Sequence, residues 1–219
     1  MPKATTQFVC AECGYVSPKW LGRCPDCGKF NTLAEEPVAP AVTGKKQTAQ
    51  ALSRAVPLSQ VKYERYERLS SGISELDVVL GGGIVRGSLV LIGGDPGIGK
   101  STLLTQVAAH LSKEHTVLYL SAEESCSQVK LRCERLGLNS DNLLLLNETN
   151  LENAEEAILS AQYVIVDSVQ AIYTDALTSA AGSVGQVREC AARLMRIAKS
   201  RGITFFLVGH VTKEGTLAG

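Results

Sequence analysis

The sequence predicts an α/β fold with a mostly parallel sheet, preceded by a small four-cysteine segment. Three observations lead to this prediction. Apolar runs alternate with segments of helical periodicity through residues 61–219, which is the pattern of α/β folds. One apolar run passes directly into a glycine-rich loop and then into a helical pattern. Four cysteines form two closely spaced pairs within residues 1–33, a turn-rich segment of different composition.

Composition separates three zones. Residues 1–33 hold the paired cysteines and are expected to form a small ribbon. Residues 34–60 are rich in Ala, Pro, Thr, Ser and Gln and lack regular apolar spacing, so they predict a flexible linker. Residues 61–219 predict the α/β core.

The bulk composition is that of a soluble globular protein. The chain has 219 residues, of which 45% are hydrophobic and 20% charged, and its formal net charge is zero. Nucleic-acid binding through global basicity is therefore excluded, and any such binding needs a local patch or assembly. No apolar run has the length of a membrane span or of a signal-peptide core. We expect a cytoplasmic protein, in which disulfides are disfavoured.

The paired cysteines are Cys10 with Cys13 and Cys24 with Cys27, each spaced C-x-x-C and each followed by glycine. Such knuckles let four thiolates converge on one tetrahedral zinc ion. Thiol redox chemistry is the alternative for a C-x-x-C pair, and two matched pairs favour zinc. A closed four-thiolate site predicts a structural zinc that stabilises a segment too small for its own core.

Other side chains of the ribbon leave two interpretations open. Basic and aromatic groups surround the knuckles and could contact nucleic acid or another protein; they are Lys19, Trp20, Arg23 and Lys29. Trp20 could equally pack on the knuckles. The remaining cysteines lack paired spacing and are predicted to pack as small hydrophobic side chains; they are Cys126, Cys133 and Cys190.

The elements of the core follow in chain order. Continuous apolar runs, typical of strands covered on both faces, predict strands at 88–92, 116–120, 142–146, 163–166 and 204–208. Helical periodicity predicts helices at 74–80, 100–112, 127–136, 151–161 and 183–200. Gly202 follows the last helix closely, as a helix stop often does.

The glycine-rich loop carries the first chemistry. Gly94, Gly99, Lys100 and Ser101 fit the pattern G-x-x-x-x-G-K-[ST]. Glycines let backbone N–H groups form a concave anion site, and the following helix adds its positive end. Lys100 is expected to reach the β- and γ-phosphates of a nucleotide, and the Ser101 hydroxyl to ligate Mg²⁺. A simple glycine-rich turn is the alternative, which the motif and its strand–loop–helix context disfavour. The residues predicted to bind nucleotide are Gly94, Asp95, Pro96, Gly97, Ile98, Gly99, Lys100, Ser101 and Thr102.

Polar side chains at other strand ends complete the predicted catalytic site. Asp167 ends an apolar run and can hold the Mg²⁺ shell through water, although aspartate is also common in turns. Glu123 and Glu124 follow another run. One could activate the attacking water, while the other charges the first turn of the next helix; Glu123 is the preferred base. His210 could sense the γ-phosphate, or be structural or merely solvated.

These motifs carry a family resemblance. The passage SSGISELDVVLGGGIVRGSLVLIGGDPGIGKSTLLTQVA resembles the RecA-like ATPase core. The ribbon FVCAECGYVSPKWLGRCPDCGKFNT, with SAEES, YVIVDSVQ and GHVTKEGTLAG, narrows the resemblance to the RadA (Sms) family of bacterial DNA repair proteins. The resemblance covers nearly the whole chain except the linker. It implies a RecA-like P-loop core that uses ATP and Mg²⁺, with Zn²⁺ in the ribbon.

The resemblance also implies a function and partners. Members are DNA-dependent ATPases of homologous recombination that promote branch migration of recombination intermediates. They form homo-oligomeric rings on DNA, single-stranded or branched, and cooperate with a RecA-type recombinase. By motif, Gly94 to Ser101 would bind ATP, Asp167 would belong to the metal-binding acidic motif, and Glu123 would be the hydrolytic base.

Some residues depart from the family pattern. Arg86 stands where proline is usual, Phe30 where tryptophan is usual, and Ala122 where glycine is commoner. The sequence ends at Gly219, whereas the family continues into a K-N-R-F-G motif and a Lon-protease-like domain. The resemblance therefore predicts a C-terminally truncated form that binds nucleotide but hydrolyses it poorly.

Three functions remain in competition. The leading one is a motor in which ATP changes the grip of a ring on DNA. A nucleotide-regulated scaffold that docks a protein partner through its zinc ribbon is the second. A small-molecule phosphotransferase ranks last, because no basic lid segment is found. Basic side chains that could grip DNA, or simply form solvated helix faces, are Lys130, Arg132, Arg135, Arg188, Arg193, Arg196, Lys199 and Arg201.

Overall fold

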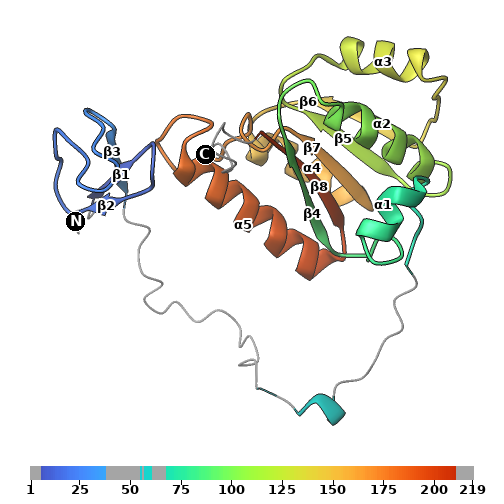
Figure 1. Cartoon of the computed structure of the whole chain (residues 1–219), viewed down its shortest axis with the longest axis horizontal. Coiled ribbons are helices and arrows are strands. Elements are labelled where there is room, and N and C mark those ends of the chain that lie inside the picture. Colours follow the sequence, from blue (N-terminus) through green and yellow to red (C-terminus); the bar gives the residue numbers. More distant parts are fainter. Residues whose placement is uncertain (1–5, 38–54, 56, 61–67, 211–219) are drawn as a thin grey trace.

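The computed structural model describes residues 6–37, 55, 57–60 and 68–210, which form a small ribbon and a larger α/β core (Figure 1). Much of the predicted linker and all residues after 210 lie outside the described residues. One 3-10 turn covers Leu58–Gln60. Within the described residues, no helix is long and apolar enough to cross a membrane.

The ribbon is a three-stranded antiparallel sheet in the order β2-β1-β3. Its strands are β1 (Thr6–Cys10), β2 (Val16–Ser17) and β3 (Leu33–Pro37). The whole of β3 pairs with β1, from Cys10 opposite Leu33 to Thr6 opposite Pro37. The linker predicted to begin at residue 34 is therefore wrong at that boundary. Backbone hydrogen bonding to β1 places residues 34–37, and this pairing leaves no apolar pattern in the sequence.

The core sheet has five parallel strands in the order β4-β8-β7-β5-β6. They are β4 (Leu89–Gly94), β5 (Val117–Ser121), β6 (Leu143–Asn147), β7 (Tyr163–Asp167) and β8 (Thr204–His210). Each predicted strand is confirmed to within two residues. The inner strands are almost wholly buried, whereas β4 and β6 at the two edges are partly exposed.

Helices cover both faces of this sheet, which accounts for the continuous apolar runs of its inner strands. Side chains alternate along each strand, so Tyr119 and Ile165 pack under α2 and α3, while Leu120 and Val166 pack under α4 and α5. The predicted small buried cysteines are confirmed for Cys133, at 8% exposure, and for Cys190, at 0%. The helices are α1 (Ser74–Val79), α2 (Lys100–Leu111), α3 (Cys126–Arg135), α4 (Leu151–Ser160) and α5 (Val184–Arg201).

The parallel arrangement brings all the carboxyl ends of the strands to one edge of the sheet. Gly94 at the end of β4 lies opposite His210 at the end of β8. Ser121 at the end of β5 lies opposite Asp167 at the end of β7. Ligands of open α/β sheets bind outside this edge, so the fold places the motifs predicted from the sequence where a ligand would meet them.

Candidate nucleotide and metal sites

The glycine-rich loop joins β4 to α2 in a conformation that needs glycine. Gly97 and Gly99 have φ angles of 82° and 100°, which side chains with a Cβ rarely adopt. Lys100 begins α2 and is buried. Its Nζ donates hydrogen bonds to the carbonyl oxygens of Gly94, at 2.7 Å, and Asp95, at 2.8 Å. These bonds hold the ammonium group against the loop.

A cavity of about 320 Å³ lies against this loop and gathers side chains from several strand ends. The loop and α2 contribute Pro96, Gly97, Gly99, Lys100, Ser101 and Thr102. The opposite wall consists of Glu123, Glu124, Arg132 and His210. Gly94, Asp95 and Ile98 belong to the loop but lie outside the cavity wall. The cavity combines two cationic groups with two carboxylates, as a site for an anion and an activated water requires.

Glu123 is held at the cavity wall by side chains from two neighbouring strands. Its Oε1 accepts a hydrogen bond from the Ser168 hydroxyl, which directly follows β7. The same oxygen lies 3.2 Å from Nε2 of His210, the last residue of β8. The carboxylate therefore has a defined position beside the phosphate loop, in direct contact with His210.

Glu124 has different partners. It forms an ion pair with Arg132 of α3, whose side chain is only 10% exposed. The expectation that one glutamate would charge the first turn of α3 is wrong, because Ser125 is the N-cap of that helix. Ser125 and Gln128 form a capping box, which leaves both glutamates in the turn before the helix.

Asp167 is buried and does not line the cavity. Its Oδ2 accepts a hydrogen bond of 2.6 Å from the Tyr119 hydroxyl, which in turn accepts one of 3.3 Å from Arg132. Burial, and next the nearby charge of Asp167, raise the pKa of Tyr119 above its usual range, so the phenol remains a donor. A continuous network therefore joins Asp167 through Tyr119 and Arg132 to Glu124.

Two residues of this site were not predicted. The sequence places Arg132 among the basic side chains that could bind DNA, but in the structure it pairs with Glu124 and Tyr119. Its only signal in the sequence is its position on the helix that follows the two glutamates. Ser168 was also missed, and its only signal is that it directly follows Asp167.

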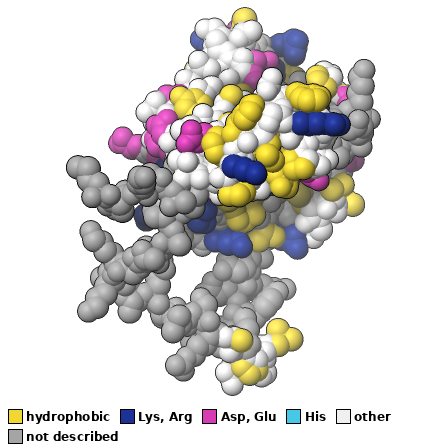
Figure 2. All heavy atoms as spheres, turned by 90° about the vertical axis from the view of Figure 1, so that its left-hand side faces the viewer, with side chains coloured by type: hydrophobic (Ala, Val, Ile, Leu, Met, Phe, Trp, Pro, Cys, Tyr) yellow, Lys and Arg dark blue, Asp and Glu magenta, His cyan; other side chains and the backbone are white. Residues whose placement is uncertain are grey.

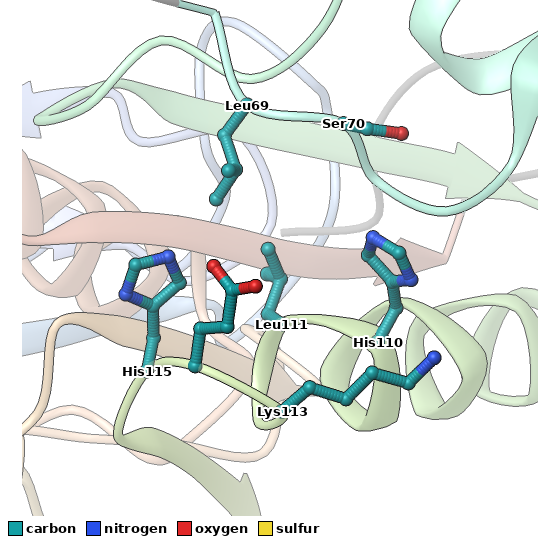
Figure 3. A pocket seen from close by; sticks show the side chains of 7 residues that line it. Leu69, Ser70, His110, Leu111, Lys113 and His115 are labelled. Carbon is teal, nitrogen blue, oxygen red and sulfur yellow. The ribbon is translucent and has the colours of Figure 1, made fainter.

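A separate cavity of about 160 Å³ lies at the far end of α2 (Figure 3). Leu69 and Leu111 line it together with His110, Lys113 and His115. One of the two histidines contacts an aromatic ring of the sheet: the rings of His115 and Tyr163 are tilted by 48°, with their centroids 5.2 Å apart. This cavity contains no residue of the predicted site and is not the candidate site.

The four paired cysteines of the ribbon form the second candidate site. Their Sγ atoms all lie within 4.8 Å of one another, with 3.7 Å between Cys10 and Cys27 and 3.6 Å between Cys13 and Cys24. A tetrahedral ion with Zn–S bonds of about 2.3 Å has sulfur–sulfur edges of roughly 3.8 Å. The residues therefore fit a four-thiolate zinc site, with Cys10 and Cys24 fully buried.

Removing one thiolate should remove the metal. We expect Cys24→Ser to lose most of its bound zinc, because serine is a poor ligand for zinc and the closed site needs all four thiolates. Metal analysis of the purified chain, measuring zinc and iron together, checks this. Full stoichiometric metal in Cys24→Ser, or iron in place of zinc in the unmodified chain, would contradict the assignment.

Two family models match the chain. The model described as an AAA domain matches residues 55–216, and the model described as a rubredoxin metal binding domain matches residues 8–35. The first contains the phosphate loop, the paired glutamates, Asp167 and His210. The second contains all four cysteines of the metal site.

Curated relatives and solved structures agree with these matches. The chain is 50% identical over 226 residues to DNA repair protein RadA of Bacillus subtilis, covering 100% of this chain and 49% of that protein. It is 52% identical over 222 residues to the protein of the same name from Listeria monocytogenes, covering 99% and 48%. The chain thus spans about half the length of these relatives. A KaiC-like protein from Pyrococcus horikoshii matches with a TM-score of 0.58 at 20% identity, over 69% of this chain and 74% of that one, which supports the RecA-like fold.

Proposed function

The chain belongs to the AAA domain family, and from this premise we propose that it is an ATP hydrolase whose turnover depends on DNA. It would act in homologous recombination and DNA repair, in the processing and branch migration of recombination intermediates. The observation that carries the proposal is the cavity that gathers Lys100, Ser101, Glu123 and His210 at one edge of the sheet. The DNA repair proteins among its relatives support the choice of process.

The phosphate loop, several side chains of the cavity wall and the nearby Asp167 have roles in this proposal. The loop N–H groups and Lys100 bind the triphosphate. The Ser101 hydroxyl and, through water, Asp167 would hold Mg²⁺, which neutralises phosphate charge when bound. Glu123 accepts the proton of the attacking water. His210 contacts Glu123 and is placed to sense the γ-phosphate.

The basic side chains available for DNA are fewer than the sequence suggested. Among those considered, the ones that pair with carboxylates are Lys130, Arg132, Arg193 and Arg196. In the part of the chain that the structure describes, those that are exposed and belong to no ion pair are Arg135, Arg188, Lys199 and Arg201. These four side chains are the candidates for phosphate contacts.

DNA should raise the rate of ATP turnover. We expect stimulation by single-stranded and branched DNA that falls steeply with salt, because phosphate contacts release counterions; 6–10 such contacts would weaken DNA binding by roughly 10³-fold or more between 50 and 200 mM salt. Steady-state turnover with and without DNA across a salt series checks this. Turnover that is indifferent to DNA at low salt would contradict the proposal.

The proposal extends to partners of the full-length protein. A RecA-type recombinase and a homo-oligomeric ring on DNA follow from the family resemblance. Since the chain spans about half of its curated relatives, both are proposed for the whole protein.

A second candidate function is a nucleotide-regulated scaffold that docks a protein partner through the ribbon. The ribbon exposes large side chains, with Val16 51%, Trp20 54% and Phe30 71% exposed. Figure 2, viewed from the side on which the ribbon lies, shows hydrophobic side chains interspersed with Lys and Arg. Such mixtures of aromatic and Arg side chains are typical of protein interfaces. Under this function, DNA would leave ATP turnover unchanged.

A further inference from the structure

The ribbon contacts the core at the first turn of α5. The backbone N–H of Val184, the first residue of α5, donates a hydrogen bond of 3.4 Å to the carbonyl oxygen of Ala11. Ala11 lies between the cysteines of the first knuckle. In the loop before α5, the Thr178 hydroxyl donates a hydrogen bond of 2.7 Å to the carbonyl oxygen of Glu35 in β3. The first knuckle and the edge strand β3 therefore contact the same region of the core.

A buried carboxylate lies at this contact. Glu36 of β3 is only 4% exposed, and it belongs to no ion pair among the residues that the structure describes. Its Oε1 faces Gly185, where an added Cβ would come within 3.3 Å of it. The carboxylate thus lies against the N-terminal turn of an 18-residue helix, where unpaired N–H groups and the helix dipole favour negative charge.

The first knuckle packs beside this carboxylate. Gly14 directly follows Cys13, and a Cβ added to Gly14 would meet the Arg188 guanidinium at 2.8 Å and the Val184 side chain at 3.1 Å. Arg188 lies one turn further along α5. The backbone of a metal-binding knuckle is therefore in direct contact with two turns of the helix.

The docked turn of α5 is connected to the nucleotide cavity. Gln186 is fully buried, and its amide donates hydrogen bonds to the carbonyl oxygens of Thr174, Leu177 and Ser179 at 3.1, 3.3 and 3.0 Å. These residues belong to the segment between β7 and α5, which begins at Ser168, the partner of Glu123. The segment between β7 and α5 therefore contacts Glu123 near its start and the ribbon near its end.

We propose that the N-terminal turn of α5 and residues 174–183 form a docking surface for the metal-bound ribbon of the same chain. Glu36 and the Ala11 carbonyl act as an additional cap of α5 supplied by the ribbon. Among its described residues, the ribbon has only four buried hydrophobic side chains, Val9, Cys10, Cys24 and Leu33, so its fold depends on the metal. Metal occupancy thereby controls the order of the loop that leads to the nucleotide cavity.

Amide hydrogen exchange on the full chain tests this surface. In the zinc-loaded protein we expect slow exchange at residues 174–188, and faster exchange there after zinc is removed with a chelator. Glu36→Gln keeps the shape of the side chain but removes its charge. We expect this variant to retain its zinc while exchange at residues 184–188 rises by about tenfold, as a lost carboxylate at a partly buried helix N-terminus allows.

Glu35→Gln is the matched control, because Glu35 is the neighbouring residue in β3 and its side chain is exposed. This variant should exchange like the unmodified chain. Equal exchange at residues 184–188 with and without zinc would overturn the proposal, as would equal effects of Glu35→Gln and Glu36→Gln. Protection that rises with protein concentration would also overturn it, since the ribbon would then dock on a second copy.

Discussion

Replacing Lys100 by alanine should lower the rate of ATP hydrolysis by at least about 100-fold, the cost of removing one group that stabilises transition-state charge. The Lys100 ammonium is buried and held against the loop by two backbone carbonyls. The triphosphate would take over these interactions, because the lysine is expected to reach the β- and γ-phosphates. Alanine keeps the helix start but leaves the phosphate charge without its nearest cation. Steady-state phosphate release and the equilibrium affinity for ATP, measured on the same samples, check both effects.

Lys113→Ala provides the matched control. Lys113 is exposed and lies just beyond the opposite end of α2, beside a cavity that contains no residue of the candidate site. The same truncation at this position should leave turnover and affinity within about twofold of the unmodified chain, as expected for an exposed side chain without such interactions. Equal turnover in the Lys100→Ala variant and the unmodified chain would mean that the chain carries no hydrolysis of its own.

The sequence could predict the edge of the sheet on which the site lies, but not the side chains that complete it. Gly94, Asp167 and His210 each end an apolar run, and parallel pairing must bring such ends together. Arg132 enters the cavity only because α3 packs on the sheet with that face turned inward. Helical periodicity predicts the helix at 127–136, but it could not tell which polar side chain of that helix would meet a carboxylate.

In the ribbon, too, the sequence predicts the local site but not the contacts between distant segments. The spacing of the cysteines predicts the metal site, because four converging thiolates are a local property of two knuckles. The extension of β3 to Pro37 and the contact of Glu36 with α5 depend on pairing and docking between distant segments. In the sequence, Glu35 and Glu36 look equivalent. In the structure one is exposed and the other is buried at a helix end.

The second large effect concerns the two glutamates after β5. Glu123→Gln should lower ATP turnover by about 10²- to 10⁴-fold, the usual contribution of a general base, because the amide cannot accept the proton of the attacking water. Glu123 has the position this role needs, since it lines the cavity beside the phosphate loop and is oriented by Ser168 and His210. Nucleotide affinity should change little, because the amide retains the shape of the side chain.

Glu124→Gln is the internal control for that experiment, since the two residues are adjacent and share the cavity wall. Its carboxylate is already engaged by Arg132, so the variant loses a partly exposed ion pair, with an expected effect on turnover below about tenfold. Single-turnover hydrolysis with ATP bound at saturation separates the chemical step from binding in both variants. A larger loss in Glu124→Gln than in Glu123→Gln would assign the base to Glu124. Arg132 and Tyr119 would then belong to the proton pathway, because they connect that carboxylate to Asp167.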